Sequence, residues 1–297
     1  MAGDVTLRFS CSAPQASVEV KANTAGFNAM ACLHRDLSGF HDANIIVEFS
    51  KVAWFDGHLT AALDLVFRQA ACRRNVVRLS GLRPRLRDTF CKNHLISKRK
   101  FDRHNTVMPI RAFEVDQALA FSGYAKRHLD RPEMPNMTAA LRRCFFESID
   151  EIFANAALHA RASLPVIVGG QYFPRRQVLA FAIVDGGEGM QRAVCAKLHR
   201  ALSPAEAIAW AMEPYNTTRQ GDVPGGLGSK VLREFIEENG GRITVVSAGG
   251  LWQQHGALVS RRHLAAPYPG TAVLLEMKTI AALPHRPVEI PDPNNIW

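Results

Sequence analysis

The stretch AIVDGGEGMQ, residues 182–191, decides how the second half of this chain folds. The apolar run from Val178 to Val184 is typical of a buried strand, and the aspartate and glycines after it end that strand. Glycine has no Cβ, so the backbone turns sharply there and lets a flat ligand lie against it. Asp185 at the strand end can accept a hydrogen bond from an exocyclic amine, such as that of adenine. Taken alone, however, the pattern is more often an ordinary Asp-Gly turn.

Upstream, the segment FFESIDEIFANAALHA, residues 145–160, has the spacing of an amphipathic helix. Glu147, Glu151, Asn155 and His159 are each four residues apart and form one stripe on this helix. Asparagine is poorly favoured in the middle of a helix, which suggests a role other than helix formation. Its amide oxygen beside Glu151 can hold Mg²⁺, which prefers oxygen ligands. A solvated polar face is the alternative interpretation of the stripe.

Downstream, the segment DVPGGLGSKVLREFIEENGG, residues 222–241, leads from glycines into a helix. The free N–H groups and positive dipole end of such a helix form an anion site. The order Gly-Ser-Lys excludes a Walker loop, and a flexible glycine hinge is the alternative. Thr218 and Arg219 just before it supply a hydroxyl and a cation, although an exposed polar loop would look the same.

The order of these motifs resembles the histidine-kinase-like (GHKL) ATPase superfamily, which includes gyrase B, MutL, histidine kinases and anti-sigma-factor serine kinases. The chain has Glu-x-x-x-Asn on a helix, Asp-x-Gly-x-Gly after a strand, a long connection, Gly-x-Gly opening a helix, and Gly270-Thr271 before a strand. Each motif is weak, and the resemblance rests on finding all of them in this order over residues 125–280. It implies a Bergerat-type α/β sandwich, with helices on one face of a mixed sheet, that binds ATP and Mg²⁺.

The resemblance also implies a role for each motif position. On the helix, Asn155 would bind Mg²⁺, Glu151 would be the general base, and His159 matches a frequent histidine or arginine at the helix end. The remaining positions would form the nucleotide site. Asp185 would bind adenine directly, Thr271 would bind it through water, and Gly187 and Gly189 would form the floor beneath it. Thr218 and Arg219 would lie near the terminal phosphate, and Gly226 and Gly228 would close the lid over the phosphates.

Residues 45–90, IIVEFSKVAWFDGHLTAALDLVFRQAACRRNVVRLSGLRPRLRDTF, resemble the STAS domain, the anti-sigma-factor-antagonist fold. Residues 45–49 match its central strand and residues 75–82 the next strand and turn. The family's phosphorylatable serine would follow Asp56, but this chain has Gly57 and His58 there. That departure argues against regulation by serine phosphorylation, and we interpret Asp56 as a helix N-cap.

Together these patterns predict an α/β protein with a STAS-like domain over residues 1–108, a linker over 109–136, the ATPase domain over 137–280 and an irregular tail over 281–297. The 297 residues are 47% hydrophobic and 21% charged, as in ordinary soluble proteins. No apolar run approaches the ~18 residues of a membrane span, and the N-terminus does not look like a secretory signal. Six scattered cysteines without a CxxC motif favour a reduced, cytoplasmic setting.

Three functions remain open. The first is an ATP- and Mg²⁺-dependent regulatory protein with a protein partner, either a serine/threonine kinase of anti-sigma type or a nucleotide-gated switch. The second is a non-catalytic ATP-binding scaffold for protein interaction. The third is nucleic-acid binding by the basic region 83–103, in line with the net charge of +9, but only Phe90 and Phe101 interrupt the basic residues, and single-strand binders usually need more aromatics.

A metal site and the assembly state have less support in the sequence. Cys32, His34 and His41 are close together, but their spacing fits no zinc pattern. Members of the resembled families often dimerise, so a homodimer stays open, and no membrane partner is expected.

Overall fold

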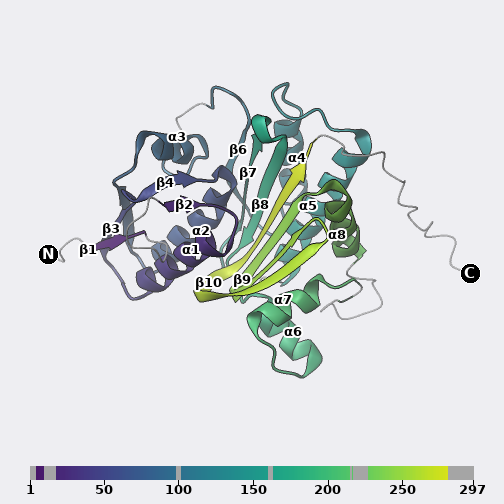
Figure 1. The fold of residues 1–297 in the computed structure, drawn as a ribbon. Coiled ribbons are helices and arrows are strands. Elements are labelled where there is room, and N and C mark those ends of the chain that lie inside the picture. Colours follow the sequence, from purple (N-terminus) through teal and green to yellow (C-terminus); the bar gives the residue numbers. More distant parts are fainter. Residues whose placement is uncertain are drawn as a thin grey trace, which may run out of the picture.

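The structure is a computed structural model that describes residues 5–9, 18–97, 102–159, 163–214, 216 and 227–279. It is an α/β protein with parallel and antiparallel sheets (Figure 1). We call residues 5–97 the N-terminal module and residues 102–279 the C-terminal module. Among the described residues, no helix has the length and apolar character needed to cross a membrane.

The C-terminal module is built on one five-stranded sheet. Its strand order is β6 (Val107–Phe113), β7 (Val166–Phe173), β8 (Val178–Asp185), β10 (Leu258–Lys278) and β9 (Arg242–His255). Every neighbouring pair in this sheet is antiparallel, whereas we expected a mixed sheet. The reason is local, because β7–β8 and β9–β10 are hairpins whose short turns reverse the chain directly.

The stretch expected to be a linker, residues 109–136, belongs to this module. It contains most of β6 and all of α4 (Ala118–Leu129). β6 pairs with β7 along the sheet edge, and the ring of Phe121 on α4 stacks on that of Phe153 with centroids 4.4 Å apart. The apolar residues in this stretch therefore form core, and the linker interpretation is wrong for the part between residues 109 and 129.

One face of the five-stranded sheet is covered by α4, α5 (Ala139–His159) and α8 (Leu227–Asn239) (Figure 1). Side chains alternate along each strand, so every second residue of β8 and β10 faces these helices. Phe181, Ile183 and Leu275 lie on this face, in one core cluster with Phe145 and Phe153 of α5. The long helix expected over 137–161 and the strand expected over 178–184 are confirmed within two residues.

The N-terminal module alternates strands and helices as expected. Its parallel strands are β1 (Val5–Arg8), β3 (Asn44–Glu48) and β5 (Val76–Ser80) in one sheet, and β2 (Val18–Val20) and β4 (Val52–Phe55) in another. Its helices are α1 (Thr24–Ser38), the short η1 (Gly57–Leu59), α2 (Thr60–Cys72) and α3 (Pro84–Lys92). The helical spacing from residue 57 to 73 and the strand at 75–79 are confirmed within one residue.

The second face of the five-stranded sheet is covered by the N-terminal module, so the expectation of helices on one face only is wrong. Helices α1 and α2 lie between the N-terminal strands and the sheet (Figure 1). A single core cluster joins Phe27 of α1 and Leu63 of α2 to Val184 and Ala272 of the sheet. The Tyr268 hydroxyl donates to the Ala62 carbonyl at 2.9 Å, and the Gln253 amide donates to the Ala22 carbonyl at 2.9 Å. The two modules therefore share one hydrophobic core.

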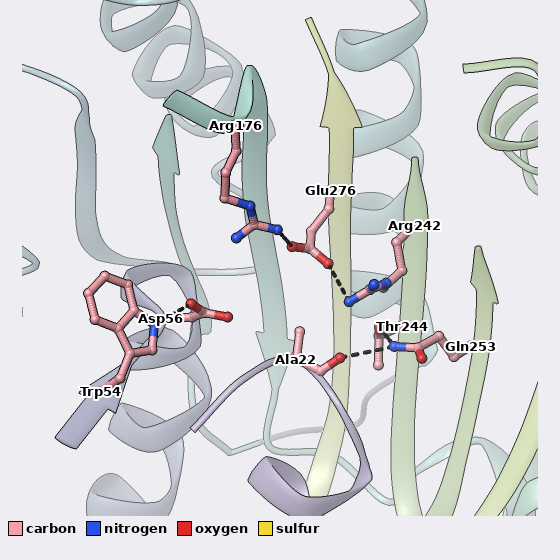
Figure 2. A network of polar contacts seen from close by, with 8 residues as sticks. All are labelled: Ala22, Trp54, Asp56, Arg176, Arg242, Thr244, Gln253 and Glu276. Atoms are coloured by element: carbon pink, nitrogen blue, oxygen red, sulfur yellow. Dashed lines mark hydrogen bonds and ion pairs between the residues drawn. The ribbon is translucent and has the colours of Figure 1, made fainter. Parts of the chain in front are cut away.

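A polar network closes the other end of this inter-module contact (Figure 2). Glu276 of β10 is buried, with 8% of its side chain exposed, between Arg176 at 3.5 Å and Arg242 at 3.2 Å. On the N-terminal side, the Trp54 indole N–H donates to the buried Asp56 carboxylate at 2.8 Å. Because these charges are partnered in place, the polar end of the contact has one defined arrangement.

Candidate functional site

Asp185, the last residue of β8, lies side by side with Thr271 and Ser247, which are within the longer strands β10 and β9. Thr271 on β10 lies opposite Asp185 on β8 and opposite Ser247 on β9. The Ser247 and Thr271 hydroxyls are 3.1 Å apart, and all three residues are buried. Since Ile183 and Val245, two residues earlier on their strands, face the helix side, these three polar side chains face it as well.

Asp185 is a buried acid at the end of a strand, 7% exposed. Its Oδ1 accepts a hydrogen bond from the Gly187 N–H at 2.9 Å. Burial raises its pKa from the ordinary 3.8 to about 6, and the hydrogen bonds from the Gly187 and Thr271 backbones only partly oppose that rise. A buried carboxylate with so few donors has remaining capacity to accept a hydrogen bond from a ligand.

The glycines beside Asp185 are required by close backbone approaches. Gly189, with φ +79°, precedes α6 (Met190–Leu198), and a Cβ there would lie 2.9 Å from the Ser247 hydroxyl. That hydroxyl accepts from the Met190 N–H at 2.8 Å, which ties the turn to β9. Gly270 has φ +125°, and a Cβ there would lie 2.0 Å from the Asp185 carbonyl oxygen. The turn is therefore packed tightly against both neighbouring strands.

Sequence reasoning missed Ser247 as a member of this group. Ser247 lies within β9, which runs from Arg242 to His255. What the sequence did not reveal was the pairing of β9 with β10, which sets Ser247 across from Thr271. A register between two strands depends on long-range contacts, which a local pattern does not contain.

Helix α5 ends near the same end of the sheet as Asp185. Its last residue is His159, β7 then begins at Val166, and Ile167 of β7 lies opposite Val184 of β8. The polar stripe on α5 changes its surroundings along the helix: Glu147 is exposed, while Glu151 and Asn155 are half-buried. The alternative interpretation, a fully solvated polar face, therefore holds for Glu147 but not for Glu151 and Asn155.

The long connection between β8 and β9 carries α6, α7 (Pro204–Met212) and α8. A capping box begins α7, in which the Ser203 hydroxyl accepts from the Glu206 N–H and the Glu206 carboxylate accepts from the Ser203 N–H. Gly228 lies in the first turn of α8. Thr218, Arg219, Gly226 and the side chain of His159 lie outside the described residues.

The position that follows Asp56 is sealed inside the molecule. Gly57 and His58 are buried against β7, and a Cβ on Gly57 would lie 1.9 Å from the Gln171 amide oxygen. Both ring nitrogens of His58 lack a hydrogen-bond partner among the described residues, and burial lowers its pKa. Asp56 is the N-cap residue of η1, as expected, but its carboxylate accepts from the Trp54 indole N–H and forms no capping hydrogen bond. A modifying enzyme has no access to this position in the folded chain.

The basic region offers little to a nucleic acid. Arg83, Arg85 and Arg87 on α3 are exposed, but Phe90 is buried and packs edge-on against Phe49 and Phe55. A buried ring is not available for base stacking. Phe101 lies outside the described residues. No group of three or more His, Cys, Asp or Glu side chains among the described residues has the geometry to hold a metal ion.

At this end of β8 the structure gathers a buried carboxylate and two buried hydroxyls, on the sheet face that the helix layer with α5 covers. Asp185 supplies a buried acceptor, Thr271 and Ser247 supply hydroxyls, and Glu151 and Asn155 supply oxygen atoms on the helix above. Comparisons of the chain with protein-family models and with curated proteins gave no match.

Proposed function

We propose that this chain is an ATP- and Mg²⁺-binding regulatory protein of the GHKL type, with a Bergerat-type nucleotide-binding domain and an N-terminal STAS-like domain. The observation that carries the proposal is the buried Asp185 carboxylate, paired across the sheet with Thr271 and facing the helix layer. A buried acid with spare acceptor capacity suits the exocyclic amine of adenine. The tight glycine turn beside it offers a flat backbone surface for the base.

The metal and phosphates belong at the other end of the same site. Asn155 on the last turns of α5 would hold Mg²⁺ through its amide oxygen, and Glu151, one turn earlier, would act as general base. Bound Mg²⁺ would neutralise phosphate charge. Gly228 at the start of α8, with Gly226, Thr218 and Arg219 before it, would contact the phosphates, since a helix N-terminus favours anions.

The reaction follows from which hydroxyl Glu151 activates. A protein serine or threonine beside the terminal phosphate would make the chain a kinase of anti-sigma type, and a water molecule would make it an ATPase. The partner would be another cytoplasmic protein. If ATP binds but is neither transferred nor hydrolysed, the chain is a nucleotide-gated scaffold, in which bound ATP exposes a surface for the partner protein.

Calorimetric titration of Mg²⁺-ATP into the full chain tests the proposal. Wild type should bind, Asp185→Asn should lose most of the affinity, and Asn155→Ala should lose affinity in Mg²⁺ but not in EDTA. Asp150→Asn, an exposed acid on α5 that accepts from the Ser122 hydroxyl at 2.7 Å, is the matched control and should bind like wild type. Absence of ATP binding by a folded wild type would refute the proposal.

Turnover is tested separately, because binding and chemistry are separable. Glu151→Ala should bind Mg²⁺-ATP like wild type and lose phosphate release and phosphotransfer, whereas Glu147→Ala on the exposed part of the same stripe should keep both. An unchanged rate in Glu151→Ala would remove Glu151 as the base. No turnover in any variant, with ATP bound, would favour the scaffold.

A further inference from the structure

A cavity of about 310 Å³ lies behind the glycine turn, between the two modules. One wall is the backbone of residues 186–189 with residues 268–270 of β10. The opposite wall comes from the N-terminal module: His34 on α1, Gln69 on α2 and Arg73 just after α2. The Asp185 side chain faces the helix layer and does not line this cavity, whereas residues of the N-terminal module do, so we treat the cavity as distinct from the proposed nucleotide site.

The charges around the cavity favour an anion. Arg73 is half-buried, and its guanidinium donates one long hydrogen bond, 3.4 Å, to the Ser38 hydroxyl. Among the described residues no carboxylate forms an ion pair with it. The one acid in the wall, Glu188, is paired with Arg192 at 3.0 Å. A half-buried guanidinium with free donors is a strong site for a phosphate or carboxylate group.

The wall formed by residues 186–189 is largely glycine backbone, which lets a small ligand approach closely. A Cβ on Gly186 would lie 3.1 Å from the Gln69 side-chain nitrogen and 3.1 Å from Leu65 Cδ1. The Gln69 side chain therefore lies close against the backbone at Gly186, where a larger residue would have to displace it. The Gln69 amide, which has two donors, faces the turn.

We propose that this cavity is a second binding site, for a small phosphate-bearing anion held between the Arg73 guanidinium and the Gln69 amide. The volume matches the lower end of small-molecule sites and accommodates a phosphate monoester. The glycine turn forms a wall of this cavity and, if the proposed function is right, the floor of the adenine site on the other side. Ligands on the two sides would then share one backbone segment, and each would change the affinity of the other by the same factor.

Titration of inorganic phosphate into the nucleotide-free full chain tests the site directly, with small monoesters such as glycerol phosphate as a second arm. Wild type should bind, and Arg73→Gln should bind roughly 10-fold or more weakly, the loss expected for a charge-assisted hydrogen bond. Arg74→Gln is the matched control, because the neighbouring Arg74 is exposed and pairs with Asp42 outside the cavity. Tighter binding of the monoester than of phosphate would identify a metabolite as the ligand, and the reverse would identify free phosphate.

Two further variants separate this site from the nucleotide site. Gln69→Glu adds a negative charge to the cavity and should abolish phosphate binding while ATP still binds. Asp185→Asn should lose ATP and keep phosphate, so the cavity is decided even if the chain binds no ATP. The proposal is overturned if folded wild type binds no phosphate, if Arg73→Gln binds it like wild type, or if saturating ATP displaces it completely in competition.

Discussion

Replacement of Asp185 by asparagine should stabilise the nucleotide-free protein at neutral pH while it removes ATP binding. The Asp185 carboxyl is buried, and its pKa is raised from 3.8 to about 6. A raised pKa in the folded state means that ionisation costs free energy there that it does not cost in the unfolded chain. Asparagine is nearly the same shape, carries no charge, and its amide oxygen still accepts from the Gly187 N–H.

The size of the effect follows from the two pKa values. A difference of about 2 in pKa, at ~1.4 kcal/mol for each pKa unit, gives ~3 kcal/mol of destabilisation when the carboxyl is ionised. Below about pH 4 the acid is protonated in both states, and the cost is absent. It develops as the unfolded chain loses its proton between about pH 4 and 6, and it is complete above about pH 6. Wild-type stability should therefore fall over this window relative to the variant.

Urea denaturation of wild type and Asp185→Asn between pH 4 and 8 measures this difference. The free energies of unfolding should be nearly equal at pH 4, and the variant should be more stable by about 2–3 kcal/mol at pH 8. Glu147→Gln, at an exposed acid on α5, serves as the control for a general loss of charge. A variant that is less stable at pH 8, or a difference that does not change with pH, would refute the reasoning that burial dominates at Asp185.

Three further predictions concern the contact between the modules and the glycine turn, each measured as the free energy of unfolding in urea. Tyr268→Phe should cost about 1 kcal/mol, because it removes the buried hydrogen bond to the Ala62 carbonyl; an unchanged value would contradict this. Glu276→Gln should cost ~2 kcal/mol, which is less than the cost of breaking a fully buried ion pair, because Arg176 and Arg242 are partly exposed and regain contact with water. A gain in stability would show that the desolvation cost of Glu276 outweighs its pairing. Gly270→Ala should cost more than about 3 kcal/mol, because φ is +125° and the new Cβ would lie 2.0 Å from the Asp185 carbonyl oxygen; wild-type stability would show that the turn can shift.

The secondary structure around the site was predictable from local patterns. The apolar run before Asp185, the helical spacing of residues 145–159 and the Ser203 capping box each appear in the structure close to where the sequence places them. These features depend on neighbouring residues, since strand and helix periodicity and capping act over a few positions. The roles of Glu151, Asn155 and Asp185 as ligand-binding residues stay predictions.

The errors concern contacts between distant segments. Residues 109–129 were expected to form a linker, and they form a sheet edge and a helix because β7, more than 50 residues later, provides the pairing partner. Asp56 is the N-cap residue of a helix, as expected, but its carboxylate accepts from the Trp54 indole N–H rather than from the helix N–H groups. In both cases the local residue types were compatible with two outcomes, and packing selected one.

By itself, the sequence determined the strand that ends at Asp185, the turn after it, and the helix with the polar stripe that is α5. The tertiary structure alone decided that Ser247 and Thr271 lie beside Asp185, and that the N-terminal module covers the second face of the sheet. It also created the cavity behind the glycine turn, whose walls come from residues more than 100 positions apart. The physical reason is that periodicity shows which residues are buried, whereas the surface against which they are buried depends on how well distant apolar faces fit together.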